Sequence, residues 1–397
     1  MRRKLQHLDY KILLPYLLLV FFGIIMVYSA SSDILLVNGF KPATYGIRQA
    51  IYAVIAFFCF ATLAFFLRLE LFKRTKFVAW FLGISMFLLF YLIVLKVFKG
   101  SDAAVNGAVG WIDLKVIRIQ PLEIAKLALV IYLAYYLDRH DGSFRQGNIV
   151  NNLIRPAVLS GVMMLLVIVE PDLGGTAILA TIVIIMFSLS GVPAKNALLY
   201  LIGIGIVVFF LVFLIVKWNP DFLQSSYQYQ RLMSFLHPFE LEQKGGAQLV
   251  NSYYAIHNGG LFGVGLGNSM QKRGYLPEPY TDFILAIAAE EIGVIGALLV
   301  LGLLFYLMWS IMEVGLHAST QFNALVCFGV TTIIFTETLF NVGAVLGLLP
   351  ITGVTLPFIS YGGSSLIVLS ASIGLVLNIA ANERIKKEEE LTDEYQS

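Results

Sequence analysis

The chain has 397 residues, of which 58% are hydrophobic and only 13% are charged. A soluble domain is about one quarter charged, so this chain has too little polar surface to cover a water-soluble globule. Its net charge of +2 gives no indication of nucleic-acid binding. Cys59 and Cys327 lie in separate apolar runs, which excludes a disulfide framework or a cysteine metal site.

Ten apolar segments are close to the roughly 17–25 residues that cross a bilayer as a helix. The first follows Met1-Arg2-Arg3-Lys4 and resembles a signal peptide, but its length and its poor cleavage site favour a retained helix. The sequence therefore predicts an all-α polytopic membrane protein with about ten transmembrane helices. They are residues 13–30, 50–67, 77–97, 122–137, 154–169, 174–189, 197–216, 283–309, 322–346 and about 356–380.

An even number of spans places both termini on one side of the membrane. The short segments on that side hold most of the lysines and arginines, so both termini are predicted to be cytoplasmic. Residues 217–281 then form one long extracytoplasmic loop. Residues 1–382 are predicted to be a single transmembrane domain, and the charged residues 383–397 are expected to be a flexible cytoplasmic tail.

Five ionisable residues fall inside predicted spans: Glu123, Lys126, Glu290, Glu291 and Glu337. Each costs on the order of 2–3 kcal/mol there by insertion scales, and such residues usually have a function. All lie in the outer half of their spans and could face an outward cavity. Glu123 and Lys126 share a helix face, as a self-neutralising structural pair or as a site for an anionic substrate. Glu290 and Glu291 point in different directions, so at most one faces the cavity, and Glu290 is our substrate-binding candidate.

The long loop ends in two motifs. Residues 259–269 are glycine-rich, and their amides can cradle a phosphate, although a plain flexible turn is the more common use of such a segment. Asp282 then stands at the start of the eighth span. Such a carboxylate is usually a helix cap, but Lys272 and Arg273 lie close in sequence, which suits a general base beside a phosphorylated membrane substrate. The loop histidines lack the spacing of a zinc site.

The last outer turn, residues 349–365, contains prolines and glycines at membrane depth. Backbone that is broken at this depth must be shielded by protein or line a wet cavity. The sequence therefore predicts a polar chamber in the outer leaflet.

These segments resemble the SEDS family of cell-shape, division and sporulation proteins, and the resemblance covers essentially the whole chain. Within the family, Asn268-Ser269, Gln271-Lys272 and residues 275–278 are more similar to the division members than to the elongation members. The sequence departs from the family pattern at Gly110 and Leu122, where many members have a basic residue and a serine. The resemblance is carried by residues 259–268, 275–293 and 349–365, with Gln120-Pro121, Glu123 and Lys126 as a fourth segment.

The resemblance implies a peptidoglycan glycosyltransferase that polymerises lipid II on the outer face of the cytoplasmic membrane, at the division septum. It implies that Asp282 is the essential aspartate, and we expect this residue to act as the general base of an inverting transfer. The groups expected to bind substrate and stabilise the leaving pyrophosphate are Arg231, Lys272, Arg273, Lys126 or a divalent cation, Mg²⁺ or Mn²⁺.

The expected partners are lipid II, a class B penicillin-binding protein, other divisome membrane proteins and membrane lipid, with no nucleic acid. An elongation-type polymerase, a lipid II flippase and a scaffold that recruits a transpeptidase are the alternatives. A flippase should need a matching inward route. The ionisable residues cluster in the outer half of the spans, which favours the enzyme.

Overall fold

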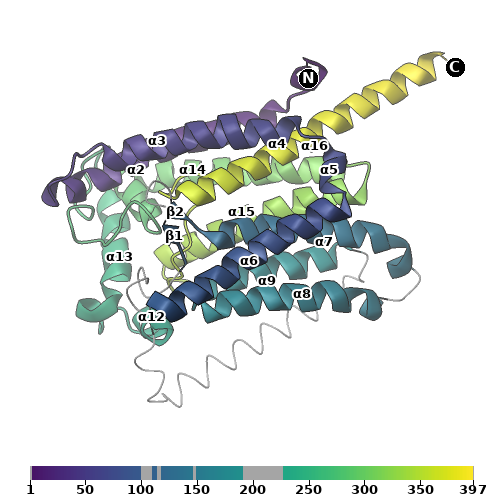
Figure 1. Ribbon diagram of the computed structural model, residues 1–397. Helices are drawn as coiled ribbons and strands as arrows, with labels where there is room; N and C mark the ends of the chain where they lie inside the picture. Colours follow the sequence, from purple (N-terminus) through teal and green to yellow (C-terminus); the bar gives the residue numbers. More distant parts are fainter. Residues whose placement is uncertain (1, 100–109, 114–117, 146–148, 191–226, 397) are drawn as a thin grey trace.

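The structure is a computed structural model that describes residues 2–99, 110–113, 118–145, 149–190 and 227–396. Within these residues, long helices lie side by side in a bundle (Figure 1). The helices are α1 (Arg2–Gln6), α2 (Tyr10–Val37), α3 (Thr44–Ile55), α4 (Thr62–Phe66), α5 (Leu69–Phe72), α6 (Thr75–Lys99), α7 (Pro121–Arg145), α8 (Ile149–Val169), α9 (Leu173–Ser188), α12 (Tyr227–Leu236), α13 (Ala247–Gly259), α14 (Ile284–Leu316), α15 (Gln321–Val345) and α16 (Gly363–Gln396).

Seven helical segments in the described part of the chain are long and apolar enough to cross a membrane. They are Tyr10–Val37, Thr44–Phe66, Thr75–Phe98, Asn152–Val169, Ile284–Leu316, Gln321–Val345 and Gly363–Asp393. Helices α7 and α9 occupy two further predicted spans. The prediction of an all-α polytopic membrane protein is therefore confirmed. Predicted span 197–216 lies outside the described residues, so the count of ten and the cytoplasmic side of the termini stay predictions.

Short polar side chains begin several of these helices. Asp9 caps α2 by accepting a hydrogen bond from the Lys11 amide at 3.0 Å. Thr320 caps α15 through the Asn323 amide at 3.3 Å. Each cap satisfies one of the amides that have no partner within the first helical turn. These local contacts fix where the apolar helices start.

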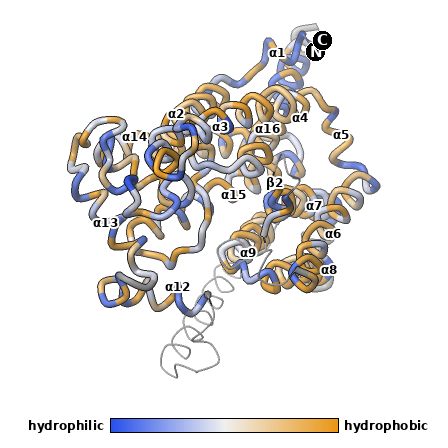
Figure 2. The backbone as a smooth tube through the Cα atoms, turned by 60° about the vertical axis from the view of Figure 1, so that its left-hand side comes forward, coloured by the Kyte–Doolittle hydropathy of each residue, from blue (hydrophilic) through white to orange (hydrophobic). Residues whose placement is uncertain are grey.

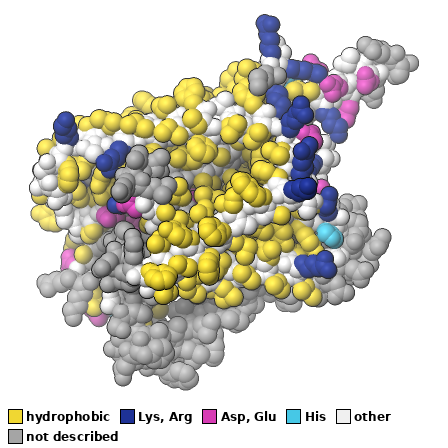
Figure 3. Space-filling view, viewed as in Figure 1, with side chains coloured by type: hydrophobic (Ala, Val, Ile, Leu, Met, Phe, Trp, Pro, Cys, Tyr) yellow, Lys and Arg dark blue, Asp and Glu magenta, His cyan; other side chains and the backbone are white. Residues whose placement is uncertain are grey.

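The two termini meet at one end of the bundle (Figure 1). Arg3 pairs with Glu389 at 2.5 Å, and Arg384 pairs with Asp9. Lysine and arginine side chains gather along this end, whereas hydrophobic side chains cover much of the remaining face in view (Figure 3). Helix α16 continues to Gln396, and the flexibility predicted for residues 383–397 stays a prediction. The tail contacts α1 and the start of α2, which the sequence pattern could not show.

At the opposite end, α12 and α13 lie across the ends of the long helices (Figures 1 and 2). A two-stranded antiparallel sheet, β1 (Ile112–Asp113) and β2 (Arg118–Ile119), precedes α7 and contacts the start of α16 through β2. Polar segments concentrate in these connections, while the long helices are mostly apolar (Figure 2).

Helix α15 forms the centre of the bundle. It packs against α7, α9, α13, α14 and α16, and most of its length is buried. Polar side chains on such a helix must find partners inside the protein. Because Glu337 and Asn341 lie on α15, this helix brings polar groups from several segments together.

Candidate active site

Asp282 lies two residues before α14 and is held by two other parts of the chain. Its carboxylate accepts a hydrogen bond from the Thr281 hydroxyl at 2.9 Å, and its main-chain carbonyl accepts one from Asn341 of α15 at 2.7 Å. The loop 349–362 contacts the same segment, because the Ser360 hydroxyl donates to the Thr281 carbonyl at 2.6 Å. The last outer turn predicted from sequence therefore packs directly beside Asp282.

The environment of Asp282 favours its action as a base. Burial raises the pKa of Asp282 above the usual aspartate value, against the opposing effects of the Thr281 hydroxyl and the positive charge of Arg231. Arg231 comes from α12, and its Nη1 donates to the Ile351 carbonyl at 2.9 Å. A raised pKa makes a carboxylate a stronger proton acceptor, and the guanidinium group supplies positive charge close by.

A buried charged cluster lies within the bundle, formed by Glu123, Lys126 and Glu337. Lys126 Nζ lies 2.8 Å from Glu123 Oε2 and also pairs with Glu337. Their side chains are only 7%, 3% and 1% exposed, respectively. The structural pair expected between Glu123 and Lys126 is present, and Glu337 is a second partner. Two carboxylates enclose one ammonium group, so Lys126 already has its charge compensated within the protein.

Asp172 joins this arrangement and was not selected from the sequence. Its side chain caps α9 by accepting from the Gly175 amide at 2.7 Å. Burial raises the pKa of Asp172; the Gly175 amide, Lys126 and Arg231 oppose this, and Glu123 adds to it. Asp172 therefore lies close enough to the buried cluster and to Arg231 for their charges to affect its pKa. The only sequence signal was an aspartate directly before an apolar run, which is typical of a helix cap.

The pKa of neighbouring Glu170 rises to about 9, mainly through burial and then through repulsion from Asp172, while Lys96 opposes the shift. Its side chain is buried, and Oε1 has no hydrogen-bond partner in the described part of the chain. Glu170 is thus neutral at pH 7.

We call Asp282, Asp172, Arg231 and the Glu123–Lys126–Glu337 cluster the outer site.

Three residues predicted to contact substrate have structural contacts within the protein. Lys272 is 1% exposed, and its Nζ lies 2.8 Å from Glu291 Oε1 of α14. The same Nζ donates to the Ser29 hydroxyl of α2. Glu290 is fully buried and accepts hydrogen bonds from the Ser269 hydroxyl and from the amides of residues 270 and 271. Arg273 is exposed and lies 3.6 Å from Asp33 at the end of α2. The side chains of Lys272 and Glu290 are enclosed and paired within the protein, and their contact with substrate stays a prediction.

The glycine-rich loop packs against a break in a neighbouring helix. Helix α14 breaks at Gly293, whose φ is +74°. The loop pairs with the backbone groups freed by this break: the Val264 and Gly265 amides donate to the Glu290 and Glu291 carbonyls, each at 2.9 Å. Amides used in this way are not available to a phosphate. The glycines are needed because the two backbones approach closely.

Replacing Gly263 by alanine tests this packing. A Cβ there would lie 2.3 Å from the Glu291 carbonyl oxygen, and φ is +82°. Gly267 is the matched control, because its φ of +84° carries the same strain while no atom lies within 4 Å of its Cβ position. The strain alone costs about 1–2 kcal/mol. We expect the apparent melting temperature to fall clearly further for Gly263→Ala than for Gly267→Ala. Equal effects would show that the close approach contributes nothing.

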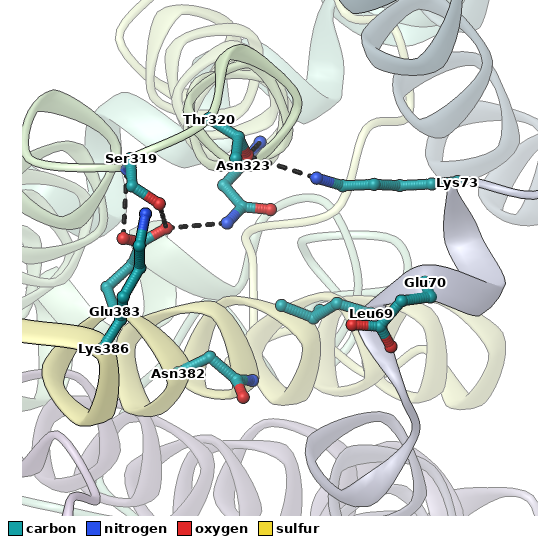
Figure 4. A pocket seen from close by; sticks show the side chains of 9 residues that line it. All are labelled: Leu69, Glu70, Lys73, Ser319, Thr320, Asn323, Asn382, Glu383 and Lys386. Carbon is teal, nitrogen blue, oxygen red and sulfur yellow. Dashed lines mark hydrogen bonds between the residues drawn. The ribbon is translucent and has the colours of Figure 1, made fainter. Parts of the chain in front are cut away.

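A pocket of about 260 Å³ lies at the other end of the bundle, where α5, the α14–α15 turn and α16 meet (Figure 4). Glu383 accepts hydrogen bonds from Ser319 and from Asn323 Nδ2 at its edge, and Lys73 donates to Thr320 at 3.3 Å. This pocket is formed near the chain termini, far along the bundle from α12 and α13. It therefore does not belong to the outer site.

The fold and the outer site define a polytopic helical membrane protein that holds an aspartate and a buried charged cluster away from the chain termini. The chain belongs to the FtsW/RodA/SpoVE family, described as cell cycle proteins, and the family model matches residues 10–385.

Relatives match over nearly their full length. A probable peptidoglycan glycosyltransferase FtsW from Lactococcus lactis subsp. lactis is 37% identical, covering 99% of this chain and 97% of the relative. One from Enterococcus hirae is 38% identical, covering 98% and 96%. Stage V sporulation protein E from Bacillus subtilis is 35% identical, covering 95% and 98%.

Solved structures show the same fold. A chain from a peptidoglycan synthase complex that coordinates polymerization and crosslinking is 27% identical with a TM-score of 0.75, covering 95% of this chain and 98% of that one. The rod shape determining protein RodA of Thermus thermophilus is 24% identical with a TM-score of 0.65, covering 95% and 97%. At 24% identity, the match to RodA is evidence for the fold only.

Proposed function

We infer that the protein is a peptidoglycan glycosyltransferase that joins lipid II units into glycan strands during cell division. Full-length relatives named as probable FtsW glycosyltransferases support the activity and the division role. Within the structure, the inference depends mainly on Asp282. It is half-buried, its pKa is raised, and it lies beside Arg231 and the last outer loop.

The proposed reaction is a single displacement. A lipid II acceptor presents its sugar 4-hydroxyl to Asp282, which accepts the proton as the oxygen attacks the anomeric carbon of the donor. The new carbon–oxygen bond forms as the bond to pyrophosphate breaks, with inversion, and the leaving lipid pyrophosphate takes the electron pair. Arg231 is best placed to stabilise this leaving group. Lys126 is not available to this leaving group, because Glu123 and Glu337 already pair with it.

A divalent cation, Mg²⁺ or Mn²⁺, fits this scheme. Among the described residues, no group of three histidine, cysteine, aspartate or glutamate side chains could hold a metal. However, Mg²⁺ is often held by one or two carboxylates together with substrate phosphates. Asp172 and the pyrophosphate of the substrate would hold the ion, and the ion would neutralise part of the charge on the leaving group.

The proposed partner is a class B penicillin-binding protein, which crosslinks the strands that this protein makes. The matching chain from a peptidoglycan synthase complex supports such a partnership. Other divisome membrane proteins and a location at the septum of the cytoplasmic membrane follow from the proposed division role.

The direct test is reconstitution of the purified protein with its penicillin-binding partner and lipid II in liposomes. We expect glycan strands longer than the disaccharide unit, visible by gel after labelling, and fewer of them after chelation of divalent cations. Translocation of labelled lipid II without any strands would contradict the proposal and support a flippase. Two further reactions separate activation of this protein from crosslinking by the partner. If strands disappear when the partner is omitted, but still form with a partner that lacks its transpeptidase nucleophile, the partner activates polymerisation without crosslinking.

A further inference from the structure

Asn341 is a buried amide that ties two segments of the outer site together. It lies on α15, one turn after Glu337, and only 1% of it is exposed. Its Nδ2 donates to the Asp282 carbonyl at 2.7 Å and to the Val354 carbonyl at 2.8 Å. One side chain therefore uses both of its donor hydrogens on backbone groups from two different loops.

The orientation of this amide is fixed by its partners. Both neighbours are carbonyl oxygens, which accept hydrogen bonds, so a flipped amide would bring three oxygens together. Oδ1 consequently points elsewhere, and no donor in the described part of the chain reaches it. A buried acceptor without a partner costs free energy. Asn341 therefore keeps this one orientation, with both of its donor hydrogens on the two loop carbonyls.

The two bonded carbonyls show what this contact does. Asp282 and Val354 both lie outside helices, where no helical hydrogen bonds fix the backbone. Thr281 and Ser360 also hold this region. The Ser360 hydroxyl donates to the carbonyl of Thr281, the residue before Asp282, and the Thr281 hydroxyl donates to the Asp282 carboxylate, whose side chain can rotate. Asn341 acts on the main chain of Asp282 itself and connects it to rigid α15. The main-chain carbonyl and the carboxylate side chain of Asp282 are attached to the same Cα, so a shift of this carbonyl also moves the carboxylate.

We propose that Asn341 is a positioning residue for Asp282, holding the carboxylate within reach of the acceptor hydroxyl. This inference rests on the proposed function, in which Asp282 is the general base. Misplacing a reacting group by about 1 Å can cost roughly 100-fold in rate. Substrate binding does not depend on the proton acceptor, so the effect should appear in kcat and leave KM nearly unchanged.

The test compares two asparagines of the same helix. Asn323 is also buried on α15, its Nδ2 donates to Glu383 at 2.7 Å, and its Oδ1 likewise has no partner in the described residues. It lines the pocket at the far end of the bundle (Figure 4). Asn341→Leu and Asn323→Leu therefore each remove a buried amide donor from one helix. Asn341 donates to two backbone carbonyls at Asp282 and Val354, whereas Asn323 donates to the Glu383 side chain far from Asp282.

We expect both leucine variants to lower the melting temperature by similar amounts, whereas only Asn341→Leu lowers kcat for glycan polymerisation, by about 10–100-fold. Asn341→Asp keeps the shape of the side chain but loses the donor hydrogens when ionised, so it should also lower kcat. This variant is used if the leucine variant does not accumulate. Equal kcat values for the Asn341 and Asn323 variants would overturn the inference. That result would leave the proposed function intact, because the function is tested separately through wild-type strand formation and Asp282 itself.

Discussion

Asp282→Asn is expected to reduce glycan polymerisation by roughly 10²–10⁴-fold, the usual contribution of a general base. Asparagine has the same shape and can still accept from the Thr281 hydroxyl, so the fold should survive. It cannot accept a proton from the attacking hydroxyl. The measurement is kcat for strand formation from lipid II in the presence of the penicillin-binding partner.

The pH profile adds a second readout. The base works only when Asp282 is deprotonated, and burial raises its pKa. The acid limb of the wild-type rate should therefore lie above the usual aspartate pKa of about 3.9, and the residual rate of Asp282→Asn should lack this limb. Asp33→Asn serves as the control and should leave the rate unchanged, because this aspartate near the end of α2 contacts the exposed Arg273 and the neighbouring Ser32 hydroxyl. An Asp282→Asn protein that polymerises as fast as wild type would refute the assignment of the base.

Lys126→Met is expected to destabilise the protein by about 3–5 kcal/mol, because it leaves two buried carboxylates without a counter-charge. The side chains of Glu123 and Glu337 are only 7% and 1% exposed, so water cannot replace the ammonium group. The apparent melting temperature and the amount of folded protein in detergent measure the effect. Adding Glu123→Gln and Glu337→Gln should recover most of the stability, because neutral amides and a thioether carry no buried charge.

The same triple variant separates the two roles left open for Lys126. If the cluster is purely structural, the neutral triple variant should be both stable and active. If Lys126 also attracts the substrate, the triple variant should be stable while KM for lipid II rises. The double variant Lys272→Met with Glu291→Gln is the control, because it removes a buried pair that lies outside the outer site. A Lys126→Met protein as stable as wild type would contradict the buried geometry.

The helices were predictable because a bilayer-spanning segment needs a long run of apolar residues, and such a run shows in the sequence without any knowledge of its neighbours. The extension of α16 to Gln396 was not predictable. Its last turns are charged and have no apolar face, and their contacts, such as Arg384 with Asp9, involve the other end of the chain. Local pattern carries no information about partners so far apart.

The candidate site divides in the same way. Asp282 could be selected from its place before a predicted helix and from the family resemblance. The burial and pairing of Lys272 and Glu290 could not be predicted, because a charged residue near a predicted cavity can face the cavity or face inward, and sequence spacing does not distinguish these orientations. Their burial depends on the break in α14 at Gly293, where the glycine-rich loop packs.

This chain can be recognised from its sequence alone as a helical membrane protein, most of its spans can be located, and Glu123, Lys126 and Asp282 can be selected as candidates for its chemistry. Hydrophobicity and helix period are properties of residues close together in the chain, so they can be detected without knowledge of the fold. The contacts between polar groups come from the folded structure: Lys126 pairs with Glu337, Asp172 lies close to the buried cluster, and Asn341 donates to the backbone of Asp282. These pairings depend on how α7, α9, α14 and α15 pack, because a buried polar group takes its partner from a neighbouring helix or loop.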